Sequence, residues 1–137
     1  MMSTHPALGI DYGEARIGVA ATDEFGILPH PVETIDCRKT KPFARIAEIA
    51  RERNIRTLIV GLPLRLDGSE GDAAKKVRNF AAKLAEVLPE IPMRFVDESF
   101  TTIDAAEKLH AAGKNAKRQK SIIDQAAAVE ILRAWMD

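Results

Sequence analysis

The sequence predicts an α/β domain built on a mixed five-stranded sheet, in which three antiparallel strands precede parallel crossovers and helices cover both faces. Two observations support this prediction. Short apolar runs separated by glycine-containing turns open the chain, and from residue 43 onward apolar residues at helical spacing alternate with further apolar runs. With 137 residues the chain can bury a substantial core. We therefore expect one domain over residues 1–137.

Three antiparallel strands are expected first. Residues 8–12 and 16–22 form two short apolar runs, and the connection between them contains glycine and has the length of a hairpin turn. A third extended run over 29–36 contains two prolines. Because proline cannot donate a hydrogen bond to a neighbouring strand, the third run is typical of a sheet edge.

Helices and strands then alternate. Helical spacing begins at Phe43 and fades at Asn54. The run 57–62 is continuously apolar, which is typical of a parallel strand covered on both faces. A second amphipathic helix over 74–88 and a strand over 93–97 complete the predicted sheet.

The remaining residues are expected to be mostly helical. A helix over 101–112 ends at Gly113, and the cationic stretch 113–120 reads as a mobile loop before a closing helix over 121–136. This order of strands and helices matches the ribonuclease H-like architecture.

Composition limits the classes of function. The chain has 20 basic and 20 acidic residues, so any affinity for nucleic acid must come from local patches. The single cysteine, Cys37, excludes an internal disulfide. No window approaches the roughly 20 apolar residues of a membrane span, and no signal sequence is evident. We expect a cytoplasmic protein that does not contact membranes.

Asp11 is the first candidate for chemistry. It shares one face of its strand with Gly9 and Gly13, so a bulky ligand or a backbone segment could approach its carboxylate closely. The alternative is that Asp11 only begins the turn. Asp97 and Glu98 end a later strand, where ligands collect in α/β sheets, and only one of them can share a face with Asp11. Their alternative role is to place negative charge at a helix start.

Asp124 lies about one turn before an apolar stripe on the last predicted helix. It either leans over the sheet or pairs with Ser121 at the start of the helix. Three converging carboxylates would repel one another unless a cation lay between them. Two Mg²⁺ ions would meet that need and could hydrolyse a phosphodiester. The histidines are assigned surface or packing roles. They are His5, His30 and His110.

Five motifs in order resemble the YqgF family, the pre-16S ribosomal RNA nucleases and Holliday junction resolvases with a RuvC-like ribonuclease H fold. They are LGIDYG (8–13), RIGVA (16–20), VGLP with DGS (60–63 and 67–69), VDE with TT (96–98 and 101–102) and DQAA (124–127). The resemblance covers nearly the whole chain. It implies that Asp11, Glu98 and Asp124 are catalytic acids that bind Mg²⁺ or Mn²⁺.

Two positions depart from the family pattern: Ser99 stands where the family commonly has Arg, and Arg65 where it commonly has Asn. The strand over 57–62 also lacks the acid of RuvC-type resolvases, so Glu98 would replace it. Local basic patches are the expected substrate contacts. They are Arg16, Arg65, Lys114, Lys117, Arg118 and Lys120.

The function expected from the resemblance is metal-dependent cleavage of structured nucleic acid, foremost processing of the 5′ end of pre-16S ribosomal RNA, with ribosomal particles as further partners. Resolution of branched DNA and metal-independent RNA binding are the alternatives. A third is nucleotide binding as in sugar kinases and actin, whose phosphate loop also reads Asp-x-Gly between strands. Those proteins close two such domains over the nucleotide, and this chain has the length of one.

Overall fold

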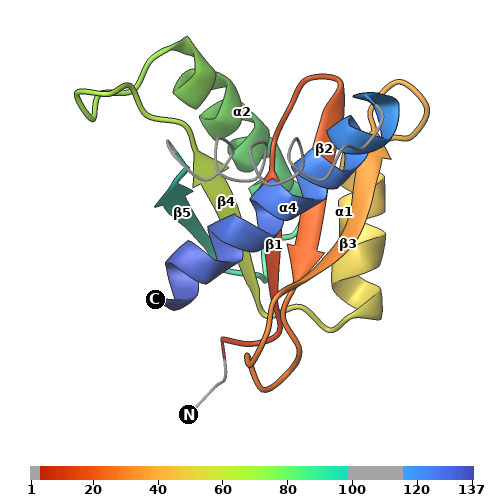
Figure 1. The fold of residues 1–137 in the computed structure, drawn as a ribbon. Coiled ribbons are helices and arrows are strands. Elements are labelled where there is room, and N and C mark those ends of the chain that lie inside the picture. The colour runs from red at the N-terminus through yellow and green to blue at the C-terminus, as the bar shows by residue number, and fades with distance from the viewer. Residues whose placement is uncertain (1–3, 99–115) are drawn as a thin grey trace.

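A computed structural model describes residues 4–98 and 116–137, with side chains in the second range described from residue 121. Five strands form one sheet in the order β3-β2-β1-β4-β5 (Figure 1). The strands are β1 (Ala7–Asp11), β2 (Arg16–Ala21), β3 (His30–Asp36), β4 (Thr57–Leu62) and β5 (Met93–Asp97). β3 lies at one edge, as the two prolines of the predicted run 29–36 indicate.

β1 is the central strand and separates two kinds of pairing. It pairs antiparallel with β2, which pairs antiparallel with β3. On its other side β1 pairs parallel with β4, which pairs parallel with β5. The predicted mixed sheet is confirmed. The carboxyl ends of β1, β4 and β5 consequently lie at the same edge of the sheet.

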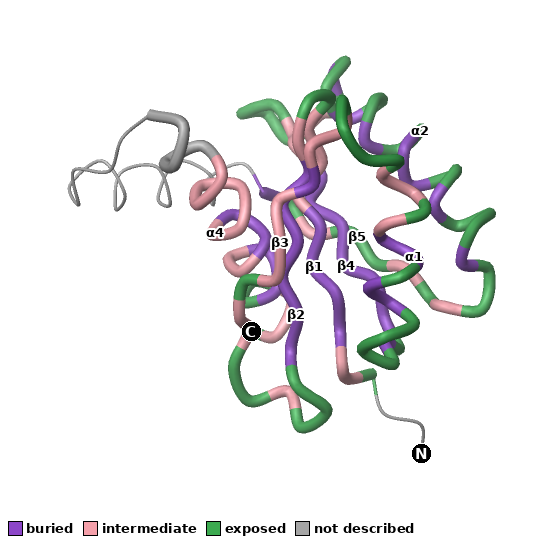
Figure 2. Tube along the Cα trace, turned by 90° about the vertical axis from the view of Figure 1, so that its right-hand side faces the viewer, coloured by how far each residue is buried: buried purple, intermediate pink, exposed green. Residues whose placement is uncertain are grey.

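Helices cover both faces of the sheet, as predicted. α1 (Pro42–Glu52) and α2 (Asp72–Val87) lie on one face, and α4 (Ala116–Met136) crosses the other (Figure 2). Each face has its own apolar core. Leu8 and Ile10 of β1 belong to the core under α1 and α2, whereas Ala7 belongs to the core under α4. The side chains of β1 thus alternate between the two helical layers.

α4 begins earlier than expected. The predicted mobile loop over 113–120 is wrong for its last five residues, because residues 116–120 are already helical. Ala, Lys, Arg and Gln are all good helix formers, and no Gly or Pro interrupts 116–120. The sequence pattern of several cations without an apolar stripe is the same for a loop as for an exposed helical turn, so the pattern could not distinguish them. The predicted helix over 101–112 and its cap at Gly113 lie outside the described residues.

No helix in the part of the chain that the structure describes is long and apolar enough to cross a membrane.

Candidate functional site

Asp11 ends β1 at the edge where the parallel strands finish. Its carboxyl lies on the α4 face, opposite the neighbouring core residue Ile10. Burial raises the pKa of Asp11, and the nearby charge of Asp124 raises it further, while a hydrogen bond with Glu98 lowers it. Asp11 is therefore no isolated turn residue, because two further acids act on it directly.

Glu98 follows β5 and is buried, with 8% of its surface exposed. Its backbone N–H donates to the carbonyl oxygen of Leu62 at 3.3 Å, which fixes the residue beside the end of β4. Burial, the Asp11 carboxylate and the charge of Asp97 together raise the pKa of Glu98 to about 9. Of the Asp97 and Glu98 pair, only Glu98 reaches Asp11, while Asp97 is exposed. This matches the expectation that only one of them shares a face with Asp11.

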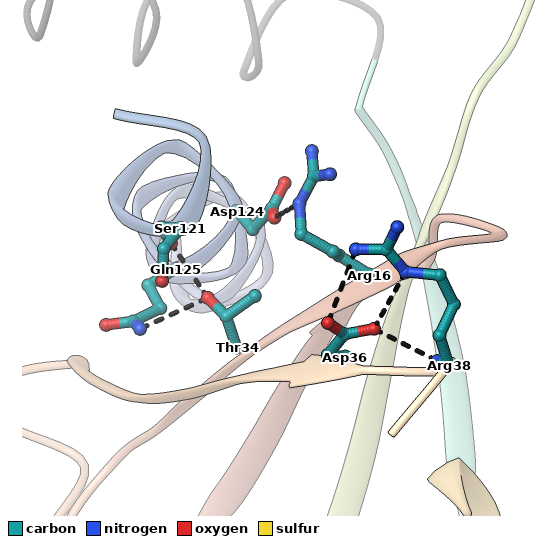
Figure 3. A network of polar contacts seen from close by, with 7 residues as sticks. All are labelled: Arg16, Thr34, Asp36, Arg38, Ser121, Asp124 and Gln125. Carbon is teal, nitrogen blue, oxygen red and sulfur yellow. Dashed lines mark hydrogen bonds and ion pairs between the residues drawn. The ribbon is translucent and has the colours of Figure 1, made fainter. Parts of the chain in front are cut away.

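Asp124 comes from α4 and faces the sheet. Its Oδ2 lies 2.8 Å from Nε of Arg16 at the start of β2 (Figure 3). Burial raises the pKa of Asp124, although the Arg16 guanidinium opposes the shift. Asp124 lies about two turns inside α4, so the alternative that it pairs with Ser121 to start the helix is wrong. It leans over the sheet instead.

The position of α4 depends on polar anchors from β3. The Thr34 hydroxyl donates to the carbonyl oxygen of Ser121 at 2.8 Å, and the Gln125 amide donates to that hydroxyl at 3.1 Å (Figure 3). Gly18 of β2 lies directly under the backbone of Asp124, where a Cβ would overlap the helix. The helix can thus approach closely enough for Asp124 to reach Arg16.

Gly9 and Gly13, on either side of Asp11 in the sequence, allow the chain's own backbone to approach. A Cβ on Gly9 would lie 2.6 Å from Cγ of Leu132 and 2.8 Å from the carbonyl oxygen of Ala128. A Cβ on Gly13 would lie 2.5 Å from the carbonyl oxygen of Arg16. Of the two expected possibilities, a ligand or a backbone segment, the backbone takes this space. Gly9 admits α4, and Gly13 permits the tight hairpin.

The three acids are neighbours without forming a closed metal site. Among residues 4–98 and 116–137, no three His, Cys, Asp or Glu side chains are arranged to hold a metal ion. Asp11 and Glu98 share a hydrogen bond, and Asp124 is held by Arg16. All the donors at the site are carboxylate oxygens, the ligands that Mg²⁺ and Mn²⁺ prefer. The oxygen ligands of the set therefore suit such an ion chemically.

The predicted basic contacts are dispersed. Arg16 is at the acids, where it binds Asp124. Arg65 is exposed in the loop between β4 and α2, and its guanidinium lies against Gly71. Lys114 lies outside the described residues. The backbones of Lys117, Arg118 and Lys120 belong to the first turns of α4 rather than to a loop.

The histidines of the described chain pack or pair at the surface. The His5 ring lies 5.2 Å from the Trp135 ring, and its Nδ1 is 3.0 Å from the Thr22 hydroxyl. His30 hydrogen-bonds Arg53 at 3.1 Å. These contacts match the packing and surface roles expected, and His110 lies outside the described residues. Cys37 is half-buried, and burial raises the pKa of its thiol, so no thiolate is favoured there.

Sequence reasoning missed the Arg16–Asp124 ion pair and the anchor from Thr34 to α4. Both connect residues 87 or more positions apart. One signal was present: the small residues Gly9, Gly18 and Gly61 occupy three strands that are neighbours in the sheet. Glycines inside strands indicate the close approach of another segment. In this fold the segment is α4.

Comparison with known proteins gives consistent matches. The model of the RuvX family, described as Holliday junction resolvase, matches residues 5–137. A Cutibacterium acnes protein named "Putative pre-16S rRNA nuclease" is 50% identical over 125 residues, which cover 91% of this chain and 78% of that protein. A Nocardia farcinica protein of the same name is 47% identical over 137 residues, which cover 95% of this chain and 76% of that protein.

Solved structures share the fold. The structure described as T. thermophilus RuvC in complex with Holliday junction substrate superposes with a TM-score of 0.59 at 18% identity, covering 95% of this chain and 94% of that one. Identity at this level supports a common architecture and not a common substrate.

Proposed function

Because the chain belongs to the RuvX family, whose members are hydrolases of nucleic acid, we propose that it is a metal-dependent endonuclease that processes the 5′ end of pre-16S ribosomal RNA. One observation carries the proposal: Asp11, Glu98 and Asp124 come from three separate elements and converge at the carboxyl ends of the parallel strands. Relatives at 43–50% identity named for this activity support the choice of substrate. Association with ribosomal particles belongs to the same proposal.

The residues that would hold the ion are Asp11, Glu98 and Asp124. Burial raises the pKa of all three acids, and the Asp11 carboxylate raises that of Glu98 further, so their ionised forms are costly unless a cation is close. A bound Mg²⁺ or Mn²⁺ would supply an activated water and stabilise the charge on the leaving oxygen. An ion held by all three acids would need Glu98 in its ionised form and would compete with Arg16 for Asp124. Arg16 would then be available to contact a substrate phosphate.

Substrate contacts beyond the acids rest on dispersed cations. Arg65 offers a guanidinium in an exposed loop, and Lys114, Lys117, Arg118 and Lys120 supply charge before or at the start of α4. Each contact to a phosphate would weaken as salt rises. We propose that these residues orient the RNA, while the acids determine where it is cut.

Cleavage assays test the proposal directly. We expect pre-16S ribosomal RNA to be cut at its 5′ end in Mg²⁺ or Mn²⁺, with no cutting in EDTA. Asp11→Asn keeps the size of the side chain but removes a charged metal ligand. We expect it to lower the rate of RNA cleavage at least 100-fold while leaving the folded state intact. Asp23→Asn, in an exposed turn outside the motifs and the basic contacts, is the matched control and should cut at the rate of the unmodified protein.

Resolution of a four-way DNA junction is the second candidate, favoured by the description of the family model. A synthetic junction in the same assay separates the two activities. Metal-dependent cutting of the junction alone would replace the RNA proposal. RNA binding that persists in EDTA, with no cutting of either substrate, would indicate a metal-independent binding factor.

A further inference from the structure

Two adjoining hollows lie on the α1 and α2 face, away from the three acids. Their volumes are about 350 and 580 Å³, and both are lined by Cys37, Pro42 and Phe43. Together they form a surface that we call the basic aromatic groove. The side chains that define it are Tyr12, Phe43, Phe80, Lys41, Lys76 and Lys83.

Three aromatic rings form the floor and wall of the groove. The Phe80 ring lies 4.6 Å from the Tyr12 ring and 5.4 Å from the Phe43 ring, measured between centroids. Phe80 is buried and holds the other two in place, whereas Tyr12 and Phe43 are only half-buried. Part of each of these two rings therefore remains open to a planar ligand. Every nucleobase can stack on such a ring, whatever its identity.

The groove carries an excess of positive charge. Lys76 pairs with Glu14 at 2.5 Å, which neutralises the acid that lines the groove. Lys41 and Lys83 have no ion-pair partner within residues 4–98 and 121–137, and both are exposed. α1 begins at Pro42 with no side-chain cap and no acid in its first turn. Its free N–H groups add to the attraction of the two lysines for an anion.

The groove lies on the face of the sheet opposite the acids. Tyr12 follows Asp11 directly, and successive side chains at the end of a strand point to opposite faces. A nucleic acid whose base stacks on Tyr12 therefore lies on the α1 and α2 face and would have to pass around the carboxyl end of β1 to reach Asp11. Phosphates on Lys41 and Lys83 would hold this strand along α1 and α2.

We propose that the basic aromatic groove binds a single-stranded segment of the nucleic-acid substrate on the face of the sheet opposite the cleavage site. Stacking on Tyr12 and Phe43 holds the bases, and Lys41 and Lys83 hold the backbone. Aromatic rings interleaved with cations are the pattern of sequence-tolerant single-strand binding. The inference rests on the proposed nuclease function for the identity of the ligand, but it concerns binding and needs no metal.

Fluorescence anisotropy with a labelled 12-nucleotide RNA in EDTA tests the groove apart from cleavage. Replacing Lys41 and Lys83 by Ala together is expected to weaken binding about tenfold and to reduce the slope of log affinity against log salt by about 1.4, since each single-strand phosphate contributes about 0.7. Tyr12→Leu is expected to weaken binding about tenfold with an unchanged salt slope. Tyr12→Phe keeps the ring and should bind like the unmodified protein.

The matched control replaces Arg51 and Lys75, two exposed cations outside the groove, by Ala and should leave affinity and slope unchanged. Equal binding by control and groove variants would overturn the proposal, as would a preference for blunt duplex of the same length. The affinity for a DNA oligonucleotide of the same sequence, measured in the same way, shows whether ribose or deoxyribose is preferred. If the unmodified protein cuts RNA but the groove variants bind RNA as tightly as it does, the groove proposal fails and the nuclease proposal stands. If the groove variants lose affinity as expected but the unmodified protein cuts no substrate, the nuclease proposal fails and the groove proposal stands.

Discussion

The carboxyls of Asp11 and Glu98 share a hydrogen bond, which requires that one of them carry a proton. Glu98 is the proton carrier, because burial and its acidic neighbours raise its pKa to about 9. A protonated acid is a poor ligand for a cation. If the site binds a metal ion as proposed, this proton must leave first, and we expect Glu98 to be the residue that loses it.

Glu98→Gln is expected to separate stability from activity. The amide donates to Asp11 without taking up a proton, so we expect the metal-free protein to gain about 1–3 kcal/mol of unfolding free energy at pH 7. We expect metal-dependent cleavage to be lost, because an amide is a weak ligand and carries no charge. Thermal melting in EDTA and the cleavage assay measure the two effects. Glu90→Gln, at an exposed position, is the control, and a lower melting temperature for Glu98→Gln would contradict the argument.

Arg16 is expected to compete with a metal ion for Asp124. The ion pair is partly exposed, so we expect Arg16→Ala to cost about 1 kcal/mol or less of stability without metal. The freed carboxylate should then lower the Mn²⁺ concentration at the midpoint of thermal stabilisation severalfold. Arg45→Ala breaks a comparable pair with Glu33 far from the acids and should leave that midpoint unchanged. An equal midpoint in both variants would show that Arg16 does not compete.

At the scale of the elements, small residues determine how α4 meets the sheet. Gly9, Gly18 and Gly61 come from β1, β2 and β4, and each would overlap α4 or its side chains if it carried a Cβ. The strands themselves could be predicted from apolar runs, because their pattern repeats over several residues. The start of α4 could not be predicted, because its first turns carry no apolar periodicity. The contact of α4 with Thr34 could not be predicted either, because it depends on the order of the strands in the sheet.

Adding a methyl group at two of these glycines should give different outcomes. The Cβ of Gly18→Ala meets the backbone of Asp124, which cannot yield without moving α4, so we expect a loss of about 1–3 kcal/mol of stability or more. The Cβ of Gly61→Ala meets Cδ1 of Ile131 and Oε2 of Glu98, at 2.5 and 2.6 Å. These side-chain ends can shift, so we expect a smaller loss of stability together with a strong loss of cleavage.

Urea unfolding and cleavage rates of the two variants check this contrast. Equal stability losses would show that the helix adjusts as easily as the two side chains. Full activity in Gly61→Ala would show that the position of the Glu98 carboxyl is not critical.

At the scale of the molecule, the sequence predicted the candidates but not their partners. Asp11 and Glu98 lie where apolar strands end, so pattern and strand order indicated them. The pairing of Arg16 with Asp124 crosses 108 residues and depends on β2 lying next to β1 beneath α4. The same limit applies to Gly9: a strand pattern shows that space is needed beside it without showing whether a ligand or another backbone segment fills it, and here the segment is α4.

The arrangement of the acids predicts that a metal ion stabilises the whole molecule. Asp11, Glu98 and Asp124 belong to the central strand, the end of an edge strand and the last helix, so one ion would join three distant parts of the chain. A ligand that binds only the folded state raises stability by about 2.7 kcal/mol at 100 times its dissociation constant. We expect Mg²⁺ or Mn²⁺ to raise the melting temperature.

Hydrogen exchange locates this effect within the fold. The amides of α4 should slow more on addition of Mn²⁺ than those of α1, which lies on the opposite face. Asp11→Asn should abolish both the slowing and the rise in melting temperature, whereas Asp23→Asn should retain them. Uniform slowing over α1 and α4, or stabilisation that survives Asp11→Asn, would place the ion elsewhere and remove the acids from the proposed mechanism.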